Sequence, residues 1–181
     1  GINAWVETDG DLLFYIGKTD SWDDYGRLVK VGRVRVSIHP RPQMKPFEQT
    51  LSLENATMTV RFGNDISPAT VLTMWVDANH PVIVVDVQST ETVEVVATIE
   101  SWRTERTTLS ELQLSDVLFD MDAPGKQRGS TVIEPDTILT DQTNRIGWFH
   151  HNVKSVGPAL HAEIQGLAEF EREDPLLHRT F

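Results

Sequence analysis

The segment with the most unusual mixture of residue types is the acidic, aromatic loop at residues 18–26. Three carboxylates lie within five positions there, beside two aromatic rings, and the residues are Asp20, Trp22, Asp23, Asp24 and Tyr25. An aromatic ring can stack on the face of a pyranose, while a carboxylate accepts hydrogen bonds from sugar hydroxyl groups. The loop is therefore a candidate saccharide contact through Asp20, Trp22, Asp23 and Tyr25.

Two other interpretations of this loop stay open. Clustered carboxylate oxygens suit Ca²⁺, although the spacing differs from the EF-hand loop, which places Asp or Asn at alternate positions and Glu at the twelfth. The third interpretation is structural, with Asp20 and Asp23 capping turns while Trp22 covers an edge of the core.

A second cluster lies at residues 148–152, with the sequence Trp-Phe-His-His-Asn. His150 and Asn152 share one face of an extended strand, and such a pair can bind sugar hydroxyls or satisfy a buried loop. We therefore count Trp148, His150 and Asn152 as further candidate saccharide contacts. His150 and His151 point to opposite faces, so they could not readily grip one metal ion.

Motifs for catalysis and for cofactors are missing from the sequence. Cysteine is absent, which excludes disulfides, zinc–thiolate sites and thiol catalysis. The chain has no G-x-S-x-G elbow, no P-loop and no G-x-G-x-x-G, which argues against the commonest serine hydrolases and nucleotide binders. A glycosidase needs two carboxyl groups roughly 5–10 Å apart, but nothing singles out a pair among the 27 acidic residues. No catalytic residue, metal site or cofactor is predicted.

The charge and hydropathy patterns exclude two classes of partner. Lys and Arg number 16 against 27 for Asp and Glu, which gives a net charge of −11. This balance repels phosphate backbones, so nucleic acid is not an expected partner. No stretch reaches the roughly 18 apolar residues of a membrane span, so no transmembrane segment is expected.

The elements that must position these clusters are mainly strands. Val, Ile and Thr together make up 47 of 181 residues and Ala only 9, a bias that favours strands over helices. The expected strands and turns are a hairpin around Asp9-Gly10-Asp11, an alternating strand at 34–38, a proline-rich loop at 40–46, a hairpin of 51–53 with 56–62, a turn at 63–65, and strands at 69–76, 82–85 and 93–99. Residues 56–62 alternate between apolar and polar side chains, which predicts one dry face, and residues 93–99 continue this alternation. The apolar run 82–85 predicts a strand covered on both faces.

Two short helices and one polar loop interrupt this pattern. Residues 108–111 match a capping box, and Leu160, Ile164 and Leu167 recur at helical spacing after Pro158. Gly166 should weaken the second helix by about 1 kcal/mol relative to Ala. Residues 122–129 form a polar loop. The sequence thus predicts an all-β, mainly antiparallel β-sandwich or supersandwich with one or two short peripheral helices, in a single domain spanning 1–181.

Three segments suggest a family. They are I-N-A-W-V-E-x-D-G-D-L-L-F-Y-I-G-K-T-D-S-W at the start, G-R-L-x-K-x-G-R-V-R-V after it, and D-P-L-L-H-R-T-F at the end. Together they resemble a bacterial domain of unknown function (number 5703). That domain in turn resembles the N-terminal β-supersandwich of glycoside hydrolase families 95 and 65. In those relatives the sandwich precedes a helical (α/α)6 barrel that holds the catalytic carboxylates.

The resemblance implies a role beside a catalytic domain. No segment resembles the barrel, so the chain is expected to be an incomplete, N-terminal part of a glycoside-hydrolase-like protein, without activity of its own. It would pack on the barrel and help to shape the substrate cleft, meeting the glycan through the parent protein. The resemblance also implies a periplasmic, cell-surface or secreted location, and an apolar face left exposed would allow homo-oligomers.

Two alternatives stay open. The chain could be an autonomous carbohydrate-binding module, which predicts a measurable sugar affinity. It could also be a small complete glycosidase that uses a carboxylate pair, which predicts turnover of aryl-glycosides.

Overall fold

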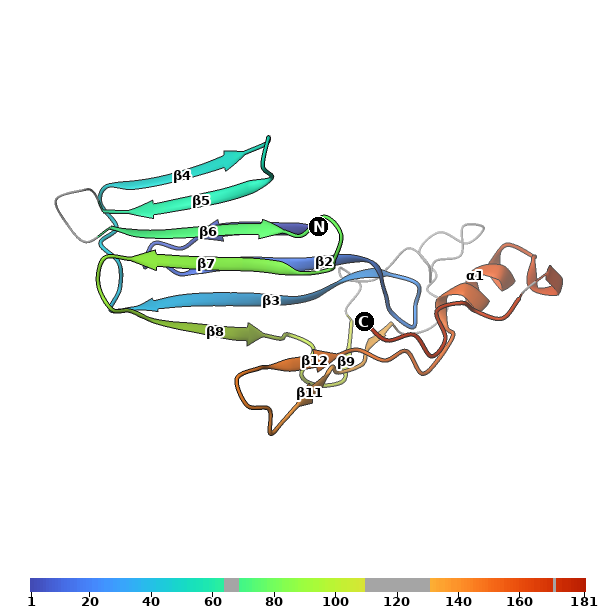
Figure 1. Ribbon diagram of the computed structural model, residues 1–181. Helices are drawn as coiled ribbons and strands as arrows, with labels where there is room; N and C mark the ends of the chain where they lie inside the picture. Colours follow the sequence, from blue (N-terminus) through green and yellow to red (C-terminus); the bar gives the residue numbers. More distant parts are fainter. Residues whose placement is uncertain (64–68, 110–130, 171) are drawn as a thin grey trace. The chain divides into compact units, whose positions relative to one another are not determined.

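The chain forms two compact units in a computed structural model that describes residues 1–63, 69–109, 131–170 and 172–181 (Figure 1). Unit 1 contains Gly1–Asn3, Tyr15–Arg33 and Ile99–Phe181, and unit 2 contains Ala4–Phe14 and Val34–Thr98. The prediction of one domain over 1–181 stays a prediction.

Most of the described residues that have regular structure lie in strands, as the composition predicts. One sheet has the order β1-β2-β3-β8, with bounds Ile2–Val6, Leu12–Trp22, Leu28–His39 and Glu94–Glu100. The other has the order β4-β5-β6-β7, with bounds Phe47–Ser52, Thr57–Phe62, Thr70–Val76 and Ile83–Ser89. The second sheet is an antiparallel meander that lies wholly in unit 2, whereas the strands of the first run through both units. The all-β sandwich prediction is confirmed.

Unit 2 contains the apolar core. In β5 the side chains of Met58, Val60 and Phe62 are buried, and the residues between them are more exposed, so the predicted alternation is confirmed. Val60 pairs with Leu72 in β6, so buried side chains of neighbouring strands lie in register. The first sheet adds the buried side chains of Leu12, Leu13, Phe14, Val36 and Ile38. Each fully buried side chain of this size contributes about 1.5–3 kcal/mol of transfer free energy.

Two predictions about burial are wrong. The run 82–85 is not covered on both faces, because Val82 precedes β7 and is exposed, and the next three residues are only half-buried. In β8 the predicted apolar row does not form a dry face, since Val95 is 46% exposed. Both strands are the last in their sheets, where a neighbour covers them on one side only.

The turns follow the glycine and aspartate pattern with one exception. Gly10 has a φ of +91°, and the amide of Asp11 donates to Asp9 Oδ1 at 3.2 Å, which confirms the predicted hairpin. Ala56, expected at the start of a strand, instead has a φ of 51° and precedes β5. Gly63 opens the next turn, and the rest of that predicted turn lies outside the described residues.

Unit 1 holds the shorter elements. Strand β9 (Thr107–Thr108) pairs with β10 (Val132–Ile133), and β11 (Thr137–Leu139) pairs with β12 (Gly147–Phe149). The predicted capping box therefore begins inside β9, and its continuation, like the loop 122–129, lies outside the described residues.

The predicted second helix is confirmed as α1 (Gly157–Ile164), with Pro158 in its first turn, and a 3-10 turn, η3 (Ala168–Phe170), follows it. Gly166 has a φ of +70° and lies just beyond the helix end, so it terminates the helix and does not weaken its interior. In the described ranges, no helix is both long and apolar enough to cross a membrane.

Candidate functional site in unit 1

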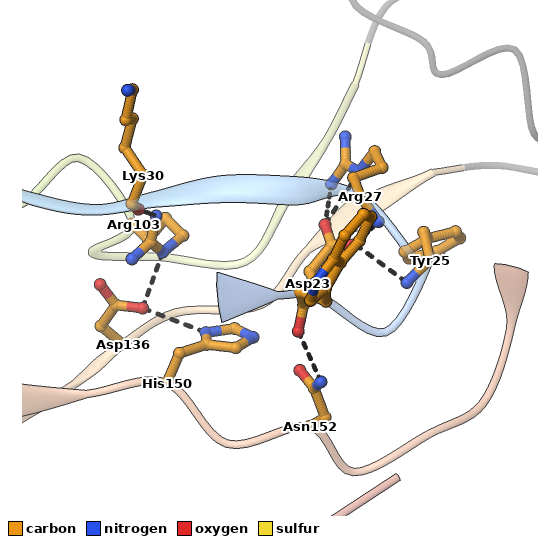
Figure 2. Close-up of polar contacts among 9 residues, drawn as sticks. Asp23, Tyr25, Arg27, Lys30, Arg103, Asp136, His150 and Asn152 are labelled. Atoms are coloured by element: carbon orange, nitrogen blue, oxygen red, sulfur yellow. Dashed lines mark hydrogen bonds and ion pairs between the residues drawn. The ribbon is translucent and has the colours of Figure 1, made fainter. Parts of the chain in front are cut away.

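A tight turn at residues 23–27 joins β2 to β3, and Asp23 organises it (Figure 2). Its Oδ1 accepts hydrogen bonds from the amides of Tyr25 and Arg27, both at 3.0 Å. Its Oδ2 accepts from Arg27 Nε at 2.8 Å and Nη2 at 2.5 Å. Gly26 adopts a φ of +72°, which closes the turn. A single carboxylate thus holds both the backbone and the arginine of this loop.

The 23–27 turn is also bonded to the C-terminal segment of unit 1. Asn152 Nδ2 donates to the carbonyl oxygens of Trp22 at 2.6 Å and Leu176 at 3.1 Å. Asp24 Oδ1 accepts from the Lys154 amide at 3.0 Å. Asn152 is fully buried, so its Nδ2 depends on these carbonyl oxygens and not on water. Segments about 130 positions apart in sequence are thereby fixed to one another.

A second polar cluster joins Arg103, Asp136 and His150. Asp136 Oδ1 accepts from Arg103 Nε at 2.7 Å and from His150 Nδ1 at 3.0 Å (Figure 2). Arg103 Nη1 and Nη2 donate to the carbonyl oxygens of Lys30 at 2.6 Å and Val31 at 2.8 Å. All three side chains are buried: Arg103 is 6% exposed, Asp136 1% and His150 3%. The charges of Arg103 and Asp136 therefore have partners, as burial requires.

The electrostatics of this cluster keep Asp136 ionised. Burial alone would raise the pKa of Asp136, but hydrogen bonds from His150 and Arg103, with the attraction of the Arg103 charge, outweigh it and lower the pKa. Asp136 is therefore a carboxylate at neutral pH, and His150 must carry a proton on Nδ1 to donate to it. In neutral His150, Nε2 is then an acceptor, and no described residue bonds to it.

A cavity of about 210 Å³ lies beside both clusters. Its charged lining consists of three acids and three bases, Asp23, Asp24, Glu134, Arg27, Lys30 and Arg103. Trp102, which is 47% exposed, and His150 also line it. The cavity combines an accessible indole, several hydrogen-bonding groups and a buried imidazole.

The structure brings some of the predicted site residues together and separates others. Asp23 and His150 both line the cavity, and Trp22 meets Asn152 through its carbonyl. The Tyr25 ring is buried beside Arg27.

Two predicted residues lie elsewhere in unit 1. Trp148 lies against Gly32 and donates from Nε1 to Val31 O at 3.0 Å. Asp20 is exposed and pairs with Lys18 at 2.9 Å. The hydrogen bond from Lys18 lowers the pKa of Asp20. The saccharide role of these residues stays a prediction.

Comparison with known proteins gives one result. A family model described as a domain of unknown function (DUF5703) matches residues 1–181. The chain belongs to the DUF5703 family. No curated protein and no solved structure matches it.

The carboxylates in the 18–26 loop of the DUF5703 chain do not converge. Asp20 pairs with Lys18, Asp23 with Arg27, and Asp24 with the Lys154 amide. Within the described ranges, no group of three or more His, Asp or Glu side chains could hold a metal ion.

Several residues of the DUF5703 site were not predicted from the sequence. Arg103, Asp136 and Trp102 lie outside both predicted clusters, and Arg103 is 33 positions from Asp136. No periodicity relates positions so far apart, because they meet only through the fold. Arginine and aspartate are common on exposed surfaces, so the sequence alone does not indicate that Arg103 and Asp136 are buried.

Proposed function

We propose that this DUF5703 chain is a non-catalytic accessory domain of a glycan-degrading enzyme, in which it contacts the glycan from one side of the substrate cleft. We further propose that the parent protein contains a helical catalytic barrel and is exported. The resemblance of the chain to glycoside-hydrolase sandwiches belongs to the same proposal. It is supported by the sequence motifs given above and by the lining of the unit 1 cavity.

The observation that carries the proposal is that each carboxylate in the cavity lining already has an internal partner. Asp23 is paired with Arg27 at 2.5 Å. Glu134 Oε1 lies 3.2 Å from Arg106 Nε and 3.7 Å from Lys154 Nζ. Asp24 accepts from a main-chain amide. Such groups are held in place to maintain the shape of the cavity, which suits recognition better than bond cleavage.

The electrostatics also favour recognition over catalysis. A glycosidase acid needs a raised pKa so that it stays protonated near neutral pH. The pKa values of Asp11, Asp20, Asp77 and Asp136 are all displaced downward. These four carboxyl groups are poor proton donors at neutral pH.

An autonomous carbohydrate-binding module is the second candidate. The accessible indole of Trp102 beside polar side chains favours it, because exposed aromatic rings are suited to stacking on sugar faces. The two candidates differ in whether the chain acts on its own or through a catalytic domain.

The test compares the natural protein that carries this chain with its Trp22→Ala variant on a polysaccharide panel. We expect KM to rise several-fold in Trp22→Ala, because an aromatic contact is lost. Trp75→Ala, which removes a half-buried indole from β6 in unit 2, should leave KM unchanged.

The 181-residue chain itself should release no product from aryl-glycosides. Turnover by the chain alone would refute the accessory role. Unchanged kinetics in Trp22→Ala would refute the contact with glycan.

A further inference from the structure

We infer that two copies of this chain associate through strand β4, whose outer edges pair antiparallel about a two-fold axis beside Gln49. Within the described part of the chain, β4 is the last strand of its sheet and pairs with β5 alone (Figure 1). The inference goes beyond the proposed function, because β4 lies in unit 2 and the cavity lies in unit 1.

Strand β4 carries apolar side chains that its own chain leaves uncovered. Phe47 is 44% exposed and Leu51 is 63% exposed. Phe47 lies against the buried ring of Phe62, with ring centroids 5.7 Å apart, and Leu51 pairs with the buried Met58. Residues directly opposite in a sheet share a face, so both exposed side chains lie on the core face of the sheet. Apolar surface at the edge of a sheet is a site for association.

The hydrogen bonds of β4 to β5 show which main-chain groups face outward. The Gly63 amide donates to the Pro46 carbonyl oxygen at 2.9 Å, one position before the printed pairing of β4 with β5 begins. Antiparallel pairs alternate between bonded and non-bonded positions, so Glu48 and Thr50 bond to β5. The residues between them turn their N–H and C=O groups to the outer edge, and they are Phe47, Gln49 and Leu51.

A two-fold axis beside Gln49 makes this edge complementary to itself. Gln49 then faces Gln49 of the second copy, and Phe47 faces Leu51 of the second copy. Each facing pair exchanges two hydrogen bonds, because the outward groups lie opposite one another. The same pairing joins the uncovered apolar side chains of the two copies. A shift by one residue would set these outward groups against groups already bonded to β5.

The local charges suit a second copy in spite of the net charge of −11. Glu48 faces Arg61 within its own chain and would face Thr50 of the second copy, so no two carboxylates are directly opposed. The strand contains no Lys, Arg or Pro, which are residues that commonly protect sheet edges. The exposed Lys45, just before β4, would lie at the same end as the exposed Glu54 of the second copy, just after its β4.

The first experiment follows the 181-residue protein over a range of concentrations by sedimentation velocity, with amide hydrogen exchange measured by NMR. We expect a reversible equilibrium between monomer and dimer. As the dimer forms, exchange should slow about tenfold or more at the outward amides of Phe47, Gln49 and Leu51. The amides of Glu48 and Thr50 should change least, because they already bond to β5.

Two variants test the edge directly. Gln49→Pro removes an N–H that faces outward and none that bonds to β5, so the dimer dissociation constant should rise about tenfold or more. Leu51→Lys places a charge opposite Phe47 of the second copy and should have an effect of the same size. Because Leu51 is exposed, this variant should keep the wild-type Tm, which makes the test decisive if Gln49→Pro unfolds.

The matched control is Val95→Lys. Val95 is also an exposed apolar residue, 46% accessible, in the edge strand β8 of the other sheet. This variant should leave the dissociation constant unchanged.

An exchange of charges tests the two-fold arrangement. Lys45→Glu should raise the dissociation constant about threefold, because it brings like charges together at both ends of the paired strands. The double variant Lys45→Glu with Glu54→Lys should restore the wild-type value.

Three results would overturn the inference. They are a protein that stays monomeric at every concentration, a dimer that Val95→Lys disrupts and Leu51→Lys does not, and exchange at Gln49 that is unchanged in the dimer. The accessory role is decided separately by the kinetics of Trp22→Ala and by turnover of aryl-glycosides.

Discussion

The two units differ in what they bury. Among the described residues, each buried large hydrophobic side chain except that of Tyr25 belongs to unit 2, where the core includes Phe62, Leu72 and Ile38. The buried polar residues lie mostly in unit 1; they are Ser21, Asp23, Asp24, Arg103, Thr131, His150, Asn152 and Asp174. Unit 2 is stabilised mainly by the hydrophobic effect, whereas unit 1 buries polar side chains that are held by hydrogen bonds and ion pairs.

This difference determines which unit can offer hydrogen-bonding side chains to a ligand. A packed apolar core tolerates substitutions that keep its volume, but it offers no hydrogen-bonding groups to a ligand. A buried polar network is exacting, because a missing partner leaves a charged or polar group unsatisfied. The same network holds side chains such as His150 in one orientation around a cavity. Unit 1 is therefore the region that we propose for the recognition of a ligand.

The largest effect is expected in the apolar core. Phe62→Ala should reduce the free energy of unfolding by about 3–5 kcal/mol, because it removes a fully buried ring from unit 2. Chemical denaturation measures this loss. Phe170→Ala, at an exposed position in η3, is the matched control and should have almost no effect. Equal losses in the two variants would contradict the assignment of the core.

Removal of a charge from the polar network should have the next largest effect. Asp136→Asn should cost about 3 kcal/mol, because it leaves the buried charge of Arg103 without its counterion. Hydrogen exchange should increase in unit 1 around residues 30–31 and 132–136, and much less in the second sheet. Asp86→Asn, at an exposed site in β7, serves as the control. An equal increase in hydrogen exchange throughout both units would contradict this difference between them.

A smaller effect is expected where a neutral side chain links two segments. Asn152→Ala should cost about 2 kcal/mol, because the carbonyl groups of Trp22 and Leu176 lose their donor. Thermal unfolding gives this value, and the exposed Asn79→Ala provides the control. A Tm identical to that of the wild type would show that water replaces the lost amide.

The weakest effect concerns acid, and it tests one carboxylate in each unit. Burial would raise the pKa of Asp11, but hydrogen bonds from Arg41 and Arg35 outweigh it and lower the pKa, as happens at Asp136 in unit 1. A lowered folded-state pKa adds stability above the unfolded value near 3.9, and this stability is lost as the pH falls through the folded value. Tm should therefore drop below about pH 4.

The variants Asp11→Asn and Asp136→Asn should each flatten this drop in Tm. An unchanged dependence of Tm on pH in both variants would contradict the lowered pKa values of Asp11 and Asp136.

The features that the sequence predicted correctly lie mainly in unit 2. The alternation of Met58, Val60 and Phe62 and the turn at Gly10 appear in short windows, and the structure confirms them. The burial of β7 and β8 was predicted wrongly, because local pattern does not show which strand ends a sheet.

The Arg103–Asp136–His150 cluster could not be predicted, since its members meet only after distant segments fold. His150 and Asn152 were predicted to share a face, and both are buried in unit 1. What sequence could not show is that Asn152 bonds main-chain groups while His150 faces a cavity.

One glycine in unit 1 places a practical limit on redesign. A Cβ added at Gly157 would lie 1.9 Å from the Tyr25 carbonyl oxygen, so no residue with a side chain fits where α1 begins. The Asp24 carbonyl also accepts the amides of Val156 and Gly157 at 2.9 and 3.2 Å. The 23–27 turn and the start of α1 therefore form one structural unit. A design that moves this turn into another scaffold, or replaces it with a loop from another protein, must move or replace both segments together.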